Sequence, residues 1–344
     1  MNNLNDLYYI GLDIHKKSIT FVIKTGGGRL VRHGSIEATR PSLEAWAAAI
    51  ERPWIGALEA TMFSGWVYDQ LLSWARRLEV AHPLMLKAIA CAKKKNDRRD
   101  ADKICDLLRC DLLPRCYMAP TEIRELRRVL RYRNLLVRQA VRMKNKVAGL
   151  LMELGESYDA QRLHRKKYFY PLVEQLSEIP ESVRELLWIS RSQMETFAQL
   201  ERRLLTALEK HALLRARVTR LRTIPGVGVV LALSWALEVG EPSRFDSIAR
   251  AVSYCGLCAA QRQSAGKARR GSLSKQRNKH LQSMLVEAAK LAPRYNEELS
   301  RVHERELQRG SRNRATLAVA RKLVAYLLAV DRQRDGFEVR AGTA

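Results

Sequence analysis

Short apolar runs of the length of β-strands recur over the first 120 positions, and the first of them begins with alternating apolar and polar residues. These runs predict strands at residues 8–14, 18–24, 30–36, 54–60 and 78–84. The segments PSLEAWAAAI, FSGWVYDQLLSWARRL and ADKICDLLR instead repeat apolar residues every three or four positions, and they predict helices. Three strands in succession, followed by alternating helices and strands, predict a mixed sheet flanked by helices. The first strand should be central, with the fourth beside it in parallel.

From residue 121 the apolar spacing becomes that of long helices. Nine positions spaced alternately three and four apart, seven of them apolar, form one stripe: Leu126, Leu130, Arg133, Val137, Ala140, Lys144, Val147, Leu151 and Leu154. A second long helix is predicted at 192–220, and the irregular basic segment 156–172 is predicted to be a hinge. The stripe fits an antiparallel pair within the chain, a seam between subunits, or a face packed on the rest of the protein.

The remaining chain, from residue 221, is predicted to be helical and interrupted by glycines. The predicted fold class is therefore α/β followed by all-α. Its regions are 1–120, a coiled-coil-like part at 121–220, a helical C-terminal domain at 221–330 and a flexible tail at 331–344. Residues 331–344 are predicted to be flexible because they show no apolar periodicity.

The charge of the chain points to a polyanionic partner. Its 344 residues include 61 Lys and Arg against 36 Asp and Glu, a formal net charge of +25. Such an excess repels itself in a compact state unless an anion compensates it, and nucleic acid is the usual compensating partner. The alternative is a soluble basic protein that binds no nucleic acid.

Cysteine usage and hydropathy indicate a cytoplasmic protein. The six cysteines do not form a disulfide-scaffold pattern, and the CxxC at 255–258 lacks a second pair at zinc-finger spacing. We therefore expect free thiols in a reducing compartment. The N-terminus does not have the pattern of a signal peptide, and the longest apolar run, 227–237, is too short to span a bilayer.

Four carboxylates stand out as candidate metal ligands. Asp13 lies at the end of a buried strand, and Glu59 ends a second strand that is predicted to lie beside the first. Asp97 and Asp100 are three residues apart, which places both on one helical face. Oxygen ligands with no nearby His or Cys favour Mg²⁺ or Mn²⁺, and two such ions about 4 Å apart can hold the attacking and leaving oxygens of a phosphodiester.

Each of these acids also has a purely structural interpretation to be weighed. Asp97 could cap the helix, and Asp100 could pair with Lys103 or Lys94 at the surface. Asp102 and Asp106 face other directions and are predicted to be solvated. Asp13 and Glu59 are harder to explain as surface charges, because their neighbours are apolar.

Two further stretches fit binding to a nucleic-acid backbone. The turn Ile224-Pro-Gly226-Val-Gly228 resembles a helix-hairpin-helix, whose glycines let backbone amides approach a phosphate. The alternative is a turn that serves helix packing alone. Segment 258–280 is rich in Lys and Arg, contains no acid and offers Ser264, Ser272 and Ser274 as equal candidate nucleophiles. Its alternative is a simple phosphate-binding loop. The triple glycine at 26–28 fits a hairpin turn, because no Lys-Ser/Thr follows it.

Taken together, these motifs resemble the bacterial DEDD transposases of the insertion-sequence one-ten family. The N-terminal marks are YIGLDIHKKS, ALEAT and NDRRDADKI, and the C-terminal marks are LRTIPGVGVVLALSWALEVG, RFDSIARAVSYCGL and QSAGKARRGSLSKQRNKHLQSMLVEAA. The resemblance covers nearly the whole chain. One departure is the spacer Arg98-Arg99, which is less charged in many relatives.

The resemblance implies a fold, an activity and site residues. It implies a RuvC-like, ribonuclease-H-like N-terminal domain whose acidic tetrad is Asp13, Glu59, Asp97 and Asp100. The motif QSAGK then places the nucleophilic serine at Ser264. Members of the family are recombinases guided by a structured RNA that pairs with donor and target DNA. They act as dimers that assemble into tetramers, and their active site is thought to combine the tetrad of one subunit with the serine of another.

The leading hypothesis is an RNA-guided DNA recombinase acting on bacterial DNA near the nucleoid. The predicted metal ligands are Asp13, Glu59, Asp97 and Asp100, and the predicted nucleophile is Ser264. The predicted nucleic-acid contacts are Gly226, Gly228, Lys267, Arg269, Arg270 and Lys275. The nearest rival is a metal-dependent nuclease for branched DNA that uses water as its nucleophile. A second rival is a nucleic-acid-binding protein with no catalytic activity.

Overall fold

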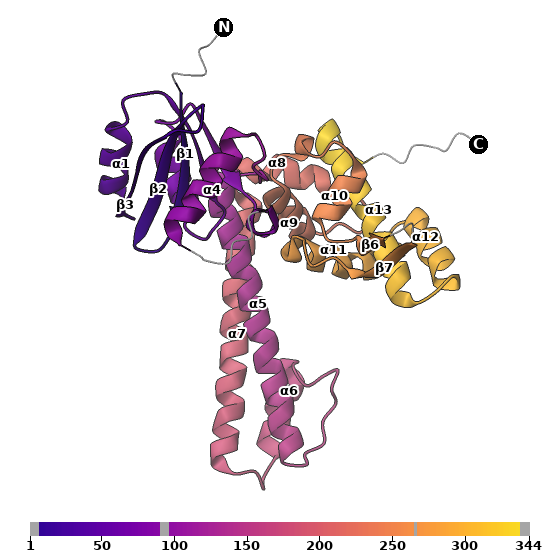
Figure 1. Ribbon diagram of the computed structural model, residues 1–344. Coiled ribbons are helices and arrows are strands. Elements are labelled where there is room, and N and C mark those ends of the chain that lie inside the picture. Colours follow the sequence, from indigo (N-terminus) through magenta and orange to yellow (C-terminus); the bar gives the residue numbers. More distant parts are fainter. Residues whose placement is uncertain (1–6, 90–95, 265–266, 338–344) are drawn as a thin grey trace, which may run out of the picture. The chain divides into compact units, whose positions relative to one another are not determined.

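The computed structural model describes residues 7–89, 96–264 and 267–337, with the backbone alone at 262–264, 267, 268 and 270. The chain divides into two compact units, residues 1–121 and 122–344, shown in Figure 1. Each unit has its own hydrophobic core, so each is described by itself.

The first unit is built on one five-stranded sheet, as the short apolar runs predict. Its strands are β1 (Tyr8–Ile14), β2 (Ser18–Thr25), β3 (Leu30–Glu37), β4 (Trp54–Glu59) and β5 (Arg77–Ala81). They lie in the order β3-β2-β1-β4-β5, with the first three antiparallel in succession and β4 and β5 parallel to β1. The prediction of a central first strand with the fourth beside it in parallel is therefore confirmed. This order is compatible with a ribonuclease-H-like domain.

Helices cover both faces of this sheet. They are α1 (Arg40–Ala48), α2 (Ser64–Leu71), α3 (Pro83–Ile89) and α4 (Asp97–Arg109). Because side chains alternate along a strand, Ile10, Leu12 and Ile14 of β1 enter the core that α1 and α2 complete. Tyr9 enters the second core, which α4 completes with Ala101, Ile104, Cys105 and Leu108. Gly11 and Asp13 share the face of Tyr9, so Asp13 lies on the side of α4.

Helix α4 approaches β1 unusually closely, and Gly11 makes this approach sterically feasible. A Cβ atom at Gly11 would lie 2.0 Å from the carbonyl oxygen of Ala101 and 2.6 Å from the backbone nitrogen of Cys105. The Cys105 thiol also donates to the Tyr9 carbonyl over 3.2 Å. The backbone of the helix therefore rests directly on the backbone of the strand.

The interactions of α4 correct two predictions. Asn96, and not Asp97, caps the helix: its side chain accepts from the backbone nitrogen of Arg98 at 3.0 Å. Asp102 and Asp106 are not merely solvated, because both bind the buried Lys24 of β2, at 2.8 Å and 2.7 Å. These ion pairs hold the helix over β2, and Asp97 keeps its carboxylate available for other contacts.

The second unit contains the two predicted long helices, α5 (Thr121–Glu153) and α7 (Glu181–Lys210). They pack on each other within the chain, where Arg133 of α5 binds Glu201 of α7, and Figure 1 shows them running side by side. Val147 of α5, Phe169 of α6 (Lys166–Gln175) and Met194 of α7 share a separate small core. Part of the predicted hinge is therefore helical. The predicted helix at 192–220 is interrupted at His211, whose extended backbone separates α7 from α8 (Ala212–Leu221).

The rest of this unit is a helical core with one hairpin. The helices α9 (Val229–Val239), α10 (Ile248–Tyr254), α11 (Lys279–Leu291), α12 (Glu297–Gln308) and α13 (Arg312–Gln333) surround residues such as Trp235. The purely helical prediction is wrong at β6 (Ala259–Ser264) and β7 (Lys267–Leu273), which pair in an antiparallel hairpin. Two short 3₁₀ turns lie at Pro242–Arg244 and Ala292–Arg294.

Two smaller expectations have mixed outcomes. Cys255 and Cys258 are free thiols, as predicted. The predicted flexible tail is in part ordered. The backbone nitrogen of Phe337 donates to Thr223 Oγ1 at 2.7 Å, and the ring centroids of Phe337 and Tyr326 lie 4.9 Å apart. Residues 338–344 lie outside the described residues.

Substitution of Gly11 by alanine should destabilise the first unit. The new Cβ would force α4 away from β1, and overpacking of this kind costs about 1–3 kcal/mol or more. The free energy of unfolding, measured in urea, is expected to fall by this amount in Gly11→Ala. Gly27→Ala is the matched control, because only one atom, at 3.9 Å, lies near its new Cβ. Equal stability of Gly11→Ala and Gly27→Ala would contradict the close packing of α4 on β1.

Candidate active site

Asp13 occupies the centre of the candidate site. It is the penultimate residue of β1 and is only 8% exposed. The parallel register pairs Leu12 of β1 with Leu58 of β4, so Asp13 and Glu59 follow side by side at the carboxyl ends of the two strands. Glu59 has the same parity as Ala57, which packs in the α4-side core, and it therefore lies on the same face as Asp13.

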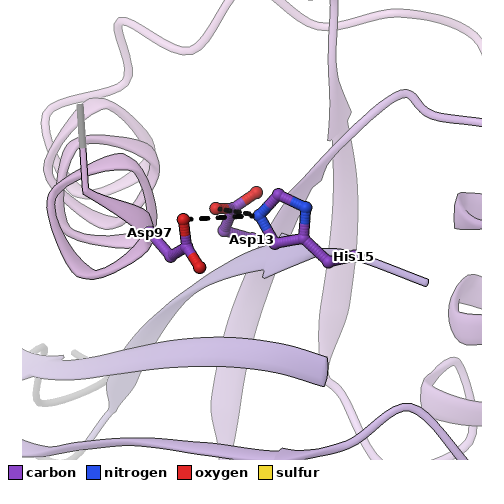
Figure 2. A group of neighbouring side chains, drawn as sticks. All are labelled: Asp13, His15 and Asp97. Atoms are coloured by element: carbon purple, nitrogen blue, oxygen red, sulfur yellow. Dashed lines mark hydrogen bonds and ion pairs between the residues drawn. The ribbon is translucent and has the colours of Figure 1, made fainter. Parts of the chain in front are cut away.

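The first turn of α4 brings a second carboxylate to Asp13. His15 Nε2 lies 3.1 Å from Asp13 Oδ2 and 3.6 Å from Asp97 Oδ1. Figure 2 shows one ring nitrogen of His15 facing both carboxylates, one from the strand and one from the helix. The potential ligand atoms of these three residues lie within 4.8 Å of one another. A single cation could therefore contact all three.

The electrostatics of Asp13 fit a cation site. Burial raises the pKa of this carboxyl, the charge and hydrogen bond of His15 lower it, and the negative charges of Asp97 and Asp100 raise it further. The net shift of the pKa is upward, so the ionised form is disfavoured here. A bound cation would offset both the burial and the mutual repulsion of the acids.

His15 is the residue that the sequence analysis missed. The predicted ligand set contained oxygen donors alone, and the structure adds a possible nitrogen donor by placing the imidazole of His15 beside Asp13. A usable signal existed, since His15 follows Asp13 by two positions at the end of the predicted strand, and side chains two positions apart on a strand share a face. The mixed donor set fits a divalent ion, because carboxylates suit Mg²⁺ and Mn²⁺ and imidazole suits transition metals.

The other two predicted ligands are less directly engaged. Asp100 accepts from Lys103 Nζ at 3.1 Å, which is one of its predicted structural partners. The other, Lys94, lies outside the described residues. The backbone carbonyl of Glu59 accepts from Ser64 Oγ at 2.8 Å, which fixes the end of β4. Asp13 and Asp97 thus meet through their shared contacts with His15. Asp100 is near enough for its charge to raise the pKa of Asp13, and Glu59 is placed beside Asp13 by the strand register.

The two glycines of the predicted helix-hairpin-helix turn differ in what surrounds them. The turn joins α8 to α9, and Gly226 has a φ of +87°. A Cβ atom there would meet Ala292 at 2.8 Å, so packing alone accounts for this glycine. Gly228 caps α9 and has no atom within 4 Å of an added Cβ. A nucleic-acid phosphate could therefore approach the backbone at Gly228. The glycine at position 226 is required by packing and gives no evidence for such a contact.

The hairpin β6–β7 carries the predicted serine and its basic neighbours. Ser264 ends β6 and pairs with Lys267, and Gln261 pairs with Arg270. Arg269 and Lys275 are exposed. The side chains of Ser264, Lys267 and Arg270 lie outside the described part of the structure. What the backbone establishes is that Ser264 and Lys267 form the last residue pair of a two-stranded hairpin.

In the described part of the chain, no helix has both the length and the apolar character needed to cross a membrane.

Comparison with known proteins identifies relatives of both units. Residues 10–155 match the family model of DEDD transposases of the IS110 type, and residues 218–304 match the Transposase IS116/IS110/IS902 family. The chain is similar to a probable family 20 transposase of Pseudomonas aeruginosa, with 27% identity over 75% of this chain and 80% of the relative. It is also similar to the transposase for insertion sequence element IS1111A of Coxiella burnetii, with 24% identity over 72% of this chain and 69% of the relative.

The two matched ranges together cover more than half of the chain, and they include the carboxylates of the first unit and the hairpin of the second. Transposases cleave and rejoin DNA. The chain belongs to the IS110 family of bacterial transposases, and it is an enzyme of that class.

Proposed function

We propose that this transposase cleaves and exchanges DNA strands with a divalent metal ion in the first unit and a serine nucleophile in the second. The observation that carries the proposal is the cluster of the buried Asp13 of β1 with His15 and with Asp97 of α4, whose potential ligand atoms lie within 4.8 Å of one another. A carboxylate that is buried beside two further acids, whose charges raise its pKa, is typical of a functional site, and a divalent cation would relieve the repulsion.

The residues that would hold the metal are Asp13, Glu59, Asp97 and Asp100, with His15 as an additional donor. When bound, a divalent cation supplies Lewis-acid stabilisation of the charge that develops on a scissile phosphate. Asp13 is held rigidly by the sheet, and Asp97 is held by a capped helix that rests on Gly11. Such preorganised ligands keep the site in position before the DNA arrives.

The proposed nucleophile is Ser264. Its Oγ would attack phosphorus, and the bond from phosphorus to the leaving strand would break as the serine-phosphorus bond forms. The serine proton would pass to solvent, and the leaving oxygen would take up a proton. Because the phosphodiester is retained as a phosphoserine ester, a hydroxyl of another strand could reverse the step and rejoin the DNA.

The basic residues of the hairpin would offset charge on the DNA. Lys267, Arg269, Arg270 and Lys275 follow the serine within the same short segment. Gly228 would add a contact through the N-terminus of α9. The net charge of +25 supports binding of a long polyanion over more than these residues alone.

A structured RNA is the proposed source of sequence specificity, with subunits acting as dimers and tetramers. Support for this part comes from the motifs that the chain shares with the family and from its excess positive charge. Base pairing would then read the donor and target sequences, while the protein would recognise duplex shape and backbone.

Replacing Asp13 by asparagine should remove cleavage and leave DNA binding intact. Loss of a metal-binding carboxylate is expected to lower the cleavage rate on the order of 100-fold or more. Cleavage of a plasmid that carries the element's ends, and DNA affinity by gel shift, are the two measurements. Asp102→Asn is the matched control, because Asp102 lies on the same helix but binds Lys24. Full cleavage by Asp13→Asn would refute the catalytic role of this site. Failure of the parent protein itself to cleave, with DNA binding intact, would support the binding-protein rival.

Replacing Ser264 by alanine tests the nucleophile. The parent protein should form a covalent adduct with DNA that survives denaturing gel electrophoresis, and Ser264→Ala should form none and exchange no strands. Ser272→Ala and Ser274→Ala are matched controls in the same segment and should keep the adduct. If Ser264→Ala cleaves at the parental rate, water is the nucleophile and the nuclease alternative is favoured.

The guide RNA is tested without any substitution. The protein is purified from cells that carry the element with its flanking sequence, and the RNA that co-purifies is sequenced. We expect one discrete species that derives from an end of the element, and addition of this RNA should restore cleavage to RNA-depleted protein. Unspecific fragments of cellular RNA, or full activity after depletion, would contradict the guided mechanism.

A further inference from the structure

Glu238 is a buried acid that the proposed chemistry does not use. It lies near the end of α9 and is 1% exposed, as the one charged residue in an otherwise apolar helix. Burial of an isolated carboxylate is costly, so its partners identify what it does. Arg131 of α5 donates to both carboxylate oxygens at 2.8 Å, and Asn278 Nδ2 donates to Oε2 at 2.9 Å.

These partners keep the acid ionised. Burial would raise the pKa of Glu238, but the hydrogen bonds and charge of Arg131, with help from Asn278 and Arg127, hold it below its ordinary value. An ionised carboxylate accepts hydrogen bonds strongly and donates none. The ionised carboxylate of Glu238 therefore needs hydrogen-bond donors around it, and the Arg131 guanidinium and the Asn278 amide supply them.

Asn278 connects this acid to the start of α11. Its Oδ1 accepts from the backbone nitrogens of His280 and Leu281, both at 3.1 Å, and so caps the helix. Its backbone nitrogen donates to the Tyr254 carbonyl at 3.0 Å, and its Nδ2 lies 3.2 Å from the Tyr254 hydroxyl. That hydroxyl donates to the Glu238 carbonyl at 2.7 Å. One side chain thus joins three helices.

This network of hydrogen bonds lies at the two chain segments that enter and leave the β6–β7 hairpin. Tyr254 ends α10 shortly before the β6–β7 hairpin begins, and Asn278 stands shortly after it ends. Between them, the Ser274 nitrogen donates to the Cys258 carbonyl at 3.0 Å and closes the hairpin's root. Ala260, Gln261, Arg269 and Ser272 of the hairpin are exposed. Its direction must therefore be set largely at the root and not by burial of its strands.

We propose that Glu238 and Asn278 are positioning residues, which fix the root of the hairpin so that Ser264 at its tip is held in a reactive orientation. Arg131 links this root to the long helix α5 through its two hydrogen bonds to Glu238. The inference rests on the proposed role of Ser264 as nucleophile. Displacement of a reacting group by about 1 Å can cost about 100-fold in rate, so a hairpin that pivots at its root would lose activity without unfolding.

Asn278→Ser and Asn278→Asp separate positioning from helix capping. Serine and aspartate are both good helix caps, so α11 should stay capped. Serine is too short to reach Glu238, and aspartate presents an acceptor to a carboxylate. The matched control is Asn296→Ser, since Asn296 caps α12 in the same way, with its side chain accepting from the Leu299 nitrogen at 3.1 Å, and has no part in the hairpin.

Two readouts are taken on the full-length protein, purified from cells that carry the element's flanking sequence. The first is hydrogen exchange of the backbone amides at 259–273, which should accelerate in both Asn278 variants and stay at the parental rate in Asn296→Ser. The second is cleavage of a plasmid carrying the element's ends. Its kcat should fall about 10- to 100-fold in both Asn278 variants, with KM near the parental value. The melting temperature should stay near the parental value in Asn278→Ser and fall in Asn278→Asp, because the aspartate sets a second carboxylate beside Glu238.

Ser264→Ala, assayed in parallel, distinguishes the two ways in which this inference can fail. If Ser264→Ala is inactive and the Asn278 variants cleave like the parent, the positioning role is overturned and the nucleophile is retained. Faster hydrogen exchange of the hairpin amides in the Asn278 variants, with kcat unchanged, would also overturn the positioning role. If Ser264→Ala cleaves at the parental rate, the nucleophile proposal itself is wrong, and the positioning role falls with it. A kcat loss that is matched by Asn296→Ser would show a capping effect alone.

Discussion

The contact between the backbone of α4 and the backbone of β1 is the constraint on which the candidate metal centre depends. Gly11 permits it, because any larger residue would place an atom inside the helix backbone. The contact lowers the first turn of α4 onto the end of the strand, which is where Asp13 lies. Lys24 then holds the same helix from β2 through Asp102 and Asp106. Acids far apart in the sequence consequently share one site.

The buried acids of this protein fall into two groups that burial alone does not distinguish. Glu238 and Asp331 are each held by an arginine fork, Asp331 by Arg217 with bonds of 2.8 Å and 2.6 Å. Such pairs neutralise the charge and join helices. Asp13 instead faces a histidine and two further acids, and its pKa is raised and not lowered. The first arrangement is complete in itself, whereas the second calls for a cation from outside.

The parts of the fold that the sequence predicted correctly have strong local patterns. The strands follow from short apolar runs and their order from the succession of strands and helices, and Asp13 and Glu59 stand out because each interrupts an apolar strand. The hairpin at 259–273 was missed because its strands, AAQRQS and KARRGSL, have little apolar alternation and pair chiefly through their backbones. His15 was missed because a histidine after a strand has many ordinary explanations. The break at His211 has no Gly or Pro to announce it.

By itself, the sequence determined the strands, the long helices and the excess of positive charge. It also singled out Asp13 and Glu59, because an acid within an apolar strand has no evident structural role. These are properties of residues and of their near neighbours along the chain. Only the tertiary structure decided that Asn96 and not Asp97 caps α4, that one nitrogen of His15 contacts two carboxylates, and that Glu238 bonds to Asn278 at the root of the hairpin. Each of these depends on which side chains meet after distant segments have packed, and packing distances of a few ångströms are not encoded in local periodicity.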